Sequence, residues 1–335
     1  MAVVSVRDVA QRAGVSVGTV SNVMNHPDKV SATTVERVQA AIAELGFIRN
    51  DAARQLRAGR STTIGLVVLD VRNPFFTELA RGAEDAAAEA GLSVTLGNSD
   101  ENPDRESAYL DLFEQQRVHG VLISPYGDIT DRIARLRSRG IPAVLVDRVS
   151  ADPSVSSVSV DDVVGGRLAA QHLLDTGRRR LAFVGASRIR QASDRLAGAR
   201  GAVDAFPSAS LEAITTSALT VAAGRETGRD LLDRPVAQRP DGIIAANDLV
   251  ALGLLQAFLG RDRAVRVPED VAIVGYDDID FAAAAVVPLT SVRQPSALLG
   301  RTAVELLLAE AANPDAPRKQ IEFVPELVVR ESTAT

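Results

Sequence analysis

Polar side chains follow directly on several apolar, strand-like runs in the second part of the chain. Because parallel strands end at one edge of a sheet, such residues converge, and ligands bind beyond that edge. Carboxylate and amide groups suit a polyhydroxylated ligand, since they accept or donate hydrogen bonds in pairs to neighbouring hydroxyls. Phe75, in the run Asn73–Phe76, would cover the ring of such a ligand. The polar residues in these positions are Asp70, Ser124, Asp147, Asn247, Asp248 and Asp277.

Each of these residues also has a structural or catalytic alternative. Asp70, Asn247 and Asp248 could simply cap the helices that follow, and Phe75 could be an ordinary core residue. A pair of the carboxylates could serve as acid and base in an α/β hydrolase or kinase. The sequence contains no G-x-S-x-G, no Walker A loop and no G-x-G-x-x-G, so it favours binding over catalysis.

The composition contains few residues of the types that bind metals or other cofactors. The chain has no cysteine, which excludes disulfides, thiolate nucleophiles and cysteine-bound zinc. Its three histidines, His26, His119 and His172, are scattered, and His172 lies in a helical pattern where a structural role is expected. We therefore expect no metal, no other cofactor and no enzyme activity.

The elements that must position the strand-end residues alternate from Thr63 onward between apolar strand-like runs and helical patterns. This alternation is typical of parallel sheets covered by helices on both faces. The runs are too many for one mononucleotide-type sheet, so the economical interpretation is an α/β unit of two doubly wound parallel-sheet lobes. The runs are residues 64–69, 94–96, 121–123, 143–146, 181–184, 242–245 and 271–274.

The first sixty residues predict a different, all-helical unit. Ser5 and Asp8 form a capping box, which predicts a helix from there to Gly14. Ser16 can cap a second helix from Val17 to Met24, after a tight glycine turn. A third amphipathic segment, residues 32–45, ends at a glycine and would close a three-helix core.

Charge is distributed unevenly between these two parts. The whole chain carries a net charge of −6, but residues 1–60 have eight Lys and Arg against five Asp and Glu, whereas the remainder has 29 against 38. A basic head on an acidic body is typical of local phosphate binding. Double-stranded DNA is therefore a candidate partner of the head.

The head resembles the headpiece of the lactose repressor (LacI/GalR) family of bacterial transcription regulators. The resemblance rests on VRDVA (6–10), AGVS (13–16), TVSNVMN (19–25) and LGF (45–47). It implies that the second helix enters the major groove and places Val17, Gly18 and Asn22 at base-reading positions. Asn22 can pair with adenine and Val17 can meet a thymine methyl group. The implied phosphate or sugar contacts are Ser16, Thr19, Ser21 and Asn25.

A short helix is also predicted over residues 50–57, capped by Asn50 and followed by Gly59. So short a helix is rarely stable alone, so it is expected to order on DNA. Leu56 is the single large apolar side chain there, and the resemblance implies that it wedges between base steps in the minor groove. The alternative is that Leu56 packs on the sensor or on a dimer partner.

The resemblance extends to about Arg330 and implies a sensor like the periplasmic sugar-binding proteins. It implies a helix-turn-helix domain at 1–48, a hinge helix and linker at 49–61, and a ligand-binding and dimerisation domain at 62–330. The first lobe would comprise about 62–160 and 290–320, and the second about 161–289 and 321–330. Leu219 stands where many relatives have an aromatic residue over the ligand. The pocket residues carried over are Phe75, Ser124, Asp147, Arg195, Asn247, Asp277 and Gln294.

These features together predict a sequence-specific DNA-binding regulator, most simply a repressor, that acts as a homodimer on a near-palindromic operator. Its effector would be a sugar or sugar derivative, with a purine or nucleoside as the alternative. An extracytoplasmic solute-binding protein would share the same body, but the chain has no export signal and carries the DNA-reading head. No apolar run approaches the roughly 18 residues that span a bilayer, so we expect a cytoplasmic, nucleoid-associated protein without a membrane partner.

Overall fold

The computed structural model describes residues 4–47, 61–186, 189–260 and 265–334. The chain divides into two compact units, one within Met1–Arg60 and the other within Ser61–Thr335. The hinge helix predicted over residues 50–57, with Leu56, lies outside the described residues. Among the described residues, no helix is both long and apolar enough to cross a membrane.

The first unit is the predicted three-helix headpiece. Its helices are α1 (Val6–Ala13), α2 (Val17–Asn25) and α3 (Ala32–Leu45), with a short 3-10 helix, η1 (Pro27–Lys29), between the last two. The capping box is present, since the Ser5 hydroxyl accepts from the backbone NH of Asp8 and the Asp8 carboxylate accepts from the backbone NH of Ser5. Val9, Val20 and Val38, one from each helix, are fully buried and form the centre of the core.

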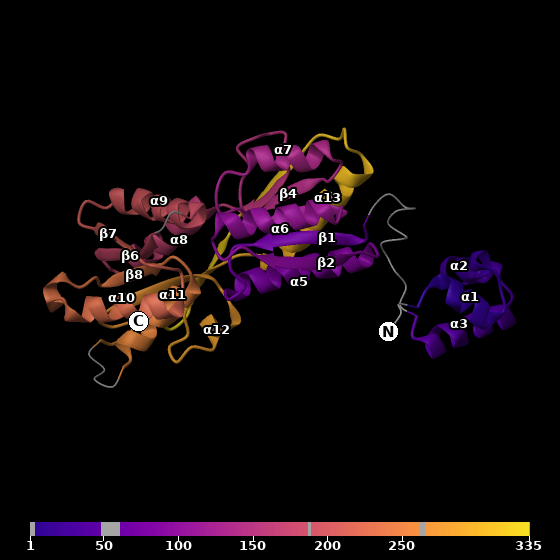
Figure 1. Cartoon of the computed structure of the whole chain (residues 1–335). Helices are drawn as coiled ribbons and strands as arrows, with labels where there is room; N and C mark the ends of the chain where they lie inside the picture. Colours follow the sequence, from indigo (N-terminus) through magenta and orange to yellow (C-terminus); the bar gives the residue numbers. More distant parts are fainter. Residues whose placement is uncertain (1–3, 48–60, 187–188, 261–264, 335) are drawn as a thin grey trace. The chain divides into compact units, whose positions relative to one another are not determined.

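The second unit contains two six-stranded sheets, each at the centre of one lobe (Figure 1). The first sheet is entirely parallel, in the order β11-β5-β4-β3-β1-β2. Its strands are β1 (Thr63–Val68), β2 (Ser93–Asn98), β3 (Gly120–Ile123), β4 (Ala143–Val146), β5 (Ser157–Val160) and β11 (Gln320–Phe323).

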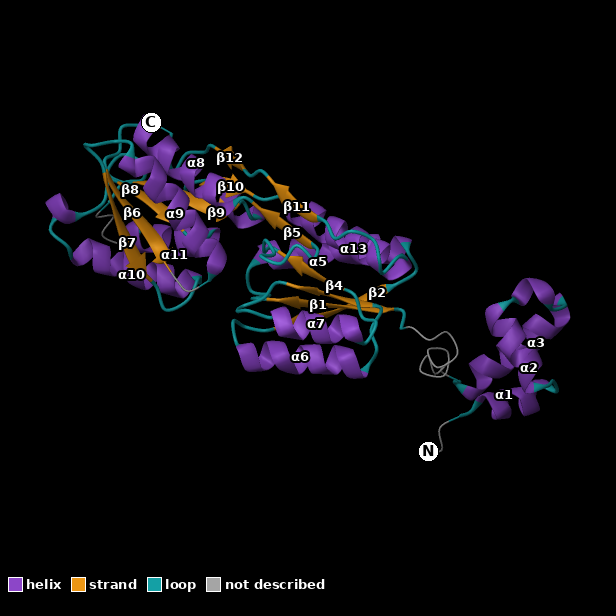
Figure 2. Cartoon of the chain, turned by 90° about the horizontal axis from the view of Figure 1, so that it is seen from above, coloured by secondary structure: helices purple, strands orange, loops and turns teal. Residues whose placement is uncertain are grey.

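The second sheet has the order β12-β10-β9-β8-β6-β7 and is parallel except for β12, which runs antiparallel to β10 at the edge. Helices cover both faces of each sheet, as expected for doubly wound lobes (Figure 2). The strands are β6 (Arg180–Ala186), β7 (Ser210–Thr215), β8 (Gly242–Ala245), β9 (Ala272–Asp277), β10 (Thr290–Arg293) and β12 (Glu326–Val328).

Helices α5 and α13 pack on one face of the first sheet and α6 and α7 on the other, while α8 and α9 face α10 and α11 across the second sheet. The bounds are α5 (Pro74–Glu89), α6 (Pro103–Gln115), α7 (Thr130–Ser138), α8 (Asp162–Asp175), α9 (Arg190–Asp204), α10 (Val221–Asp233), η2 (Val236–Gln238), α11 (Asp248–Phe258), α12 (Asp280–Ala283) and α13 (Ser296–Ala312).

The chain passes between the lobes at three places, two of which differ from the predicted boundaries. The first passage, between β5 and α8, lies where the sequence analysis put it. The prediction assigned residues 290–320 to the first lobe and 321–330 to the second. Instead, β10 pairs with β9 in the second sheet and β11 pairs with β5 in the first. Each of these strands has only four residues. The lobe to which it belongs depends on the strand it pairs with, and no local sequence pattern reveals that distant partner.

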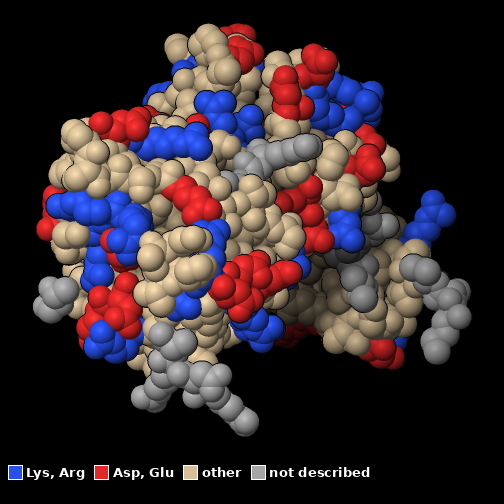
Figure 3. All heavy atoms as spheres, turned by 90° about the vertical axis from the view of Figure 1, so that its left-hand side faces the viewer, with Lys and Arg blue, Asp and Glu red and all other residues tan. Residues whose placement is uncertain are grey.

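Charge on one face of the second lobe is mixed rather than grouped. The face in Figure 3, which looks onto this lobe, shows acidic and basic side chains interspersed among uncharged ones. A duplex backbone is bound by a continuous array of basic groups, so this face does not have the character of a DNA-binding surface.

Candidate functional site

Helix α2 presents the residues predicted to read DNA. The Ser16 side chain caps it by accepting from the backbone NH of Thr19 at 3.1 Å, so the helix begins where the prediction placed it. Val17 is 41% exposed although it is large and apolar, and Asn22 is also exposed. A Cβ on Gly18 would meet only the Ser16 hydroxyl, at 3.6 Å, so packing within the headpiece does not require glycine there.

The predicted phosphate-contacting residues lie on the same helix or at its cap. Asn25 donates to the backbone oxygen of Ser21 at 2.8 Å and closes the end of α2. The Ser16 and Thr19 hydroxyls lie 2.9 Å apart. The remaining predicted DNA contact, Leu56, is outside the described residues.

In the second unit, Arg195 lies at the centre of a buried charged cluster. It is 6% exposed, and its Nε donates to Asp162 at 2.7 Å while its terminal nitrogen donates to the backbone oxygen of Ala246 at 2.7 Å. The same nitrogen lies 3.7 Å from Asp277, and the guanidinium carbon lies 3.6 Å from the centre of the Tyr276 ring. Arg195 thus pairs with a buried acid and also lines a cavity.

Two glycines bring Arg195 and Asp162 together. A Cβ on Gly166 of α8 would lie 1.9 Å from the backbone oxygen of Arg195, and one on Gly198 of α9 would lie 1.9 Å from that of Val163. A larger residue at either position would push the two helices apart. The close approach of α8 and α9 is therefore what allows the short ion pair between them.

Asp277 joins the two lobes. Its backbone φ is 101°, a left-handed value rare outside glycine, and such strain is concentrated at functional sites. Asn73, at the start of α5 in the first lobe, donates to Asp277 at 2.7 Å. Gln294 donates to its other oxygen at 2.8 Å.

A second contact between the lobes is made by Asp147, directly after β4. Gln191, on α9 of the second lobe, donates to the Asp147 carboxylate at 2.8 Å and to its backbone oxygen at 2.6 Å. Asp147 also has a left-handed backbone, with φ of 57°. With Asn73 and Asp277, these bonds hold the two lobes in a closed arrangement.

An inner cavity of about 50 Å³ lies between the closed lobes. Five of the seven predicted pocket residues line it, while Ser124 and Gln294 are buried without lining it. Leu219 lines it too, so an aliphatic side chain occupies this wall. The predicted lining residues are Phe75, Asp147, Arg195, Asn247 and Asp277.

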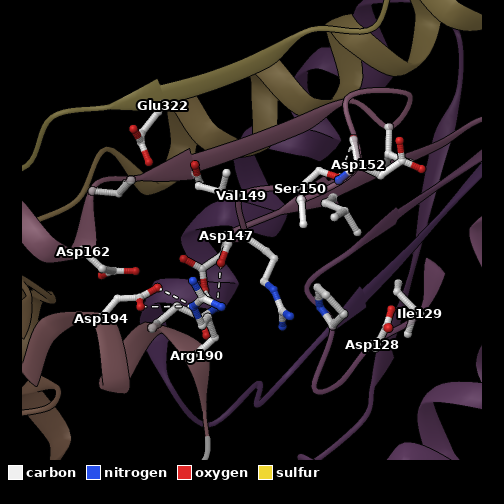
Figure 4. A pocket seen from close by; sticks show the side chains of 18 of the residues that line it. Asp128, Ile129, Asp147, Val149, Ser150, Asp152, Asp162, Arg190, Asp194 and Glu322 are labelled. Carbon is white, nitrogen blue, oxygen red and sulfur yellow. Dashed lines mark hydrogen bonds and ion pairs between the residues drawn. The ribbon is translucent and has the colours of Figure 1, made fainter. Parts of the chain in front are cut away.

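An outer cavity of about 510 Å³ opens beside the inner one and shares Asp147 and Gln191 with it. Figure 4 shows its walls: Asp128 and Ser150 belong to the first lobe, while Asp162 and Asp194 belong to the second. Pockets for small ligands commonly measure about 300–1,000 Å³, so of these two cavities the outer one has that size.

Capping of the following helix was the alternative given for three strand-end residues, and only Asn247 has that role, because Asn73 and not Asp70 caps α5. Asn247 caps α11 by accepting from the NH of Val250 at 2.9 Å, although it also lines the inner cavity. Asp248 accepts from the Ser291 hydroxyl at 2.7 Å and from the NH of Ile279, within the second lobe. Asp70 pairs with Arg72 at 2.8 Å.

The sequence analysis missed Gln191 and Asp162, and it named Asn73 only as part of an aromatic run. Gln191 stands four residues before Arg195, so helical spacing alone places both on one face of α9. Asp162 looks like a first-turn helix residue, which concealed its role as the partner of Arg195. The remaining histidine candidate, His172, bonds Thr333 at 2.7 Å, in keeping with the structural role expected of it.

Burial sets the protonation of this cluster. It raises the pKa of Asp147, Asp162 and Asp277, and the carboxylates also repel one another. Burial alone would lower the pKa of Arg195, but Asp162, Tyr276, Asp277 and Asp147 together raise it, so the guanidinium stays charged.

Closure of the empty lobes is therefore expected to depend on pH. A carboxyl whose pKa is raised on closing takes up a proton, so the closed arrangement gains stability as pH falls and loses it as pH rises through the raised pKa. Each proton taken up would shift the equilibrium about tenfold per pH unit within that window. Small-angle scattering between pH 8 and 5 should report a more compact two-lobed unit at low pH. The Asp147→Asn variant should lose part of this response, and expansion on acidification would contradict the prediction.

Comparisons with known proteins agree with this arrangement. Residues 5–50 match the bacterial regulatory proteins of the lacI family, and residues 170–333 match a periplasmic binding protein-like domain. The chain is 32% identical to the HTH-type transcriptional repressor PurR of Photobacterium profundum, over 98% of both chains. It is also 32% identical to the ribose operon repressor of Escherichia coli K12, over 98% of this chain and 99% of the relative.

Solved structures match over most of the length. The lac repressor dimer bound to operator and the anti-inducer ONPF has a TM-score of 0.84 at 28% identity, with 99% of both chains covered. A LacI family transcriptional regulator from Enterococcus faecium with bound ribose has a TM-score of 0.74 at 30% identity, with 81% of this chain and 98% of that chain covered.

A helix-turn-helix headpiece joined to a two-lobed, periplasmic-binding-protein-like unit defines a transcription regulator and not an enzyme. The full-length relatives, above 30% identity, make the assignment specific. The chain belongs to the lacI family of bacterial regulatory proteins.

Proposed function

We propose that this protein is a transcriptional repressor that binds a near-palindromic operator as a homodimer, in the cytoplasm and on the nucleoid. The observation that carries the proposal is the surface of α2, a capped helix on which Val17 and Gly18 stand in the first turn and Asn22 lies one turn after Gly18. A second helix of this kind lies in the major groove, with its N-terminal residues against base edges. Ser16, Thr19, Ser21 and Asn25 would contact the backbone around it.

We further propose that a sugar or sugar derivative bound between the lobes controls operator affinity. The E. faecium regulator holds ribose in a unit of the same fold, and polar groups from both lobes meet here at Asp147, Arg195 and Asp277. A ligand that binds the closed lobes better than the open ones shifts the equilibrium toward closure. In a dimer, closure would change the separation of the hinge segments, where Leu56 would enter the minor groove.

Selection of duplexes from a random library by the full-length protein tests the proposal. We expect enrichment of a near-palindrome whose half-sites lie about one helical turn apart. Affinity for it should fall steeply as salt rises, because phosphate contacts release counterions. A protein that enriches no sequence, with or without a panel of sugars and nucleosides, would refute the proposed function.

A further inference from the structure

The closed lobes bury three carboxyl groups around a single cation. Asp147, Asp162 and Asp277 are each at most 9% exposed, and Arg195 is the cation among them. Its short ion pair is with Asp162, and Asp277 lies a full 3.7 Å from its nearest nitrogen. Charges taken out of water cost several kcal/mol unless they are paired. Two of these three carboxylates therefore lack a closely paired cation within the cluster.

Asp147 also has an oxygen with no partner. Gln191 donates to one carboxylate oxygen, while the other, Oδ1, is buried and receives no hydrogen bond from the described residues. Asp147 lines both cavities, so a donor in either would lie beside this carboxylate. An unpaired, buried carboxylate oxygen calls for a donor, and a charged donor makes the stronger bond.

The outer cavity also has more carboxyl groups than guanidinium groups in its lining. Seven of its lining side chains are carboxylates and two are guanidinium groups. One of these, Arg190, already bonds Asp194 through both carboxylate oxygens, at 2.9 and 3.1 Å. Glu322, on β11, lies at the rim of the outer cavity (Figure 4). Burial raises the pKa of Glu322, and the nearby Asp161 and Asp162 raise it further.

We infer that the effector carries an ammonium group, which lies in the outer cavity against the Asp147 carboxylate, and that its hydroxylated ring fills the remaining space. The inference rests on the proposed function, because it specifies the effector of the same cleft. The 510 Å³ of the outer cavity holds a ligand of this size, whereas the 50 Å³ inner cavity does not. An amino sugar combines the two required chemistries.

An anionic effector, such as a sugar phosphate, fits these charges poorly. It would need free cations, but Arg195 is engaged by Asp162 and Arg190 by Asp194. Arg148, the other guanidinium in the lining, is half-buried, and its pKa is lowered by burial first and then by Arg190, so Asp128, Asp194 and Glu106 offset these effects only in part. An added anion would meet more carboxylates than guanidinium groups, so binding should weaken as the ligand becomes more negative.

The test is a charge series on one ring, with binding followed by calorimetry or ligand-observed NMR on the full-length protein. D-glucosamine, D-glucose and D-glucose 6-phosphate form one series, and galactosamine and mannosamine with their parent sugars extend it. At about pH 6.5 the amine is protonated. We expect at least one amino sugar to bind about tenfold or more tightly than its parent, and the phosphate to bind weakest.

Two variants test whether the preference for the amino sugar arises in the outer cavity. Asp147→Asn should reduce the ratio of amine to parent affinity about tenfold, and Glu322→Gln, at the exposed rim, about threefold. Glu84→Gln, on the exposed face of α5 and outside the lining, is the matched control and should leave the ratio unchanged. An unchanged ratio in Asp147→Asn would remove the ammonium from the proposed place.

The result separates the two proposals. If no amino sugar binds more tightly than its parent, including the case in which none binds, the inference is wrong. If the protein selects an operator that only an uncharged sugar releases, the inference fails and the repressor function stands. If an amino sugar binds with the expected preference but no duplex sequence is selected, the proposed function fails while the ligand assignment holds.

Discussion

Arg195→Ala should abolish the effect of ligand on operator binding and destabilise the two-lobed unit by about 3–5 kcal/mol, the usual result of removing one partner of a buried ion pair. The variant would leave Asp162 and Asp277 buried beside a void, without their shared cation. The headpiece is a separate compact unit, so operator binding itself should be retained at temperatures where the second unit stays folded.

Thermal unfolding and operator titration with and without effector measure both effects. Arg200→Ala, an exposed position on the same helix, is the control and should behave like the parent protein. The loss of stability should shrink as pH falls, because protonated aspartates no longer need the guanidinium. An Arg195→Ala protein with a normal effector response would exclude Arg195 from the binding site.

Asn22→Ala should weaken specific operator binding without changing effector affinity. An asparagine that pairs with adenine contributes about 1–3 kcal/mol of discrimination, so two half-sites predict a loss of about 30-fold or more. Binding to random duplex should change little, because phosphate contacts supply most of that affinity. Fluorescence anisotropy with the selected operator and with a scrambled duplex separates the two quantities.

Gln39→Ala provides the matched control for Asn22→Ala. Gln39 is exposed on α3 of the same headpiece, away from the helix proposed to read bases. Its replacement should leave the operator affinity within about twofold, as for most exposed substitutions. Equal losses in the two variants would indicate that headpiece stability, and not base reading by α2, determines affinity.

Local patterns predicted most of the elements. The headpiece helices lie within one residue of their expected bounds, because capping side chains and left-handed glycines mark their ends. Six of the seven predicted apolar runs became buried strands, whereas residues 94–96 lie in β2, which is mostly exposed. Apolar runs did not predict β7, whose residues are mostly exposed, or the short strands β10, β11 and β12. Such strands form because a distant edge offers hydrogen bonds, which the local residues do not reveal.

The sequence by itself determined the two-unit organisation, the family resemblance and the strand-end positions of Asp147, Asn247 and Asp277. Only the tertiary structure decided which charges meet, because Asp147 and Gln191 are 44 positions apart and Asn73 and Asp277 are 204 apart. Whether a carboxylate is solvated, paired or left short of a cation depends on burial and on neighbours from other elements. That balance, and with it the charge expected of the effector, arises when the two lobes close on each other.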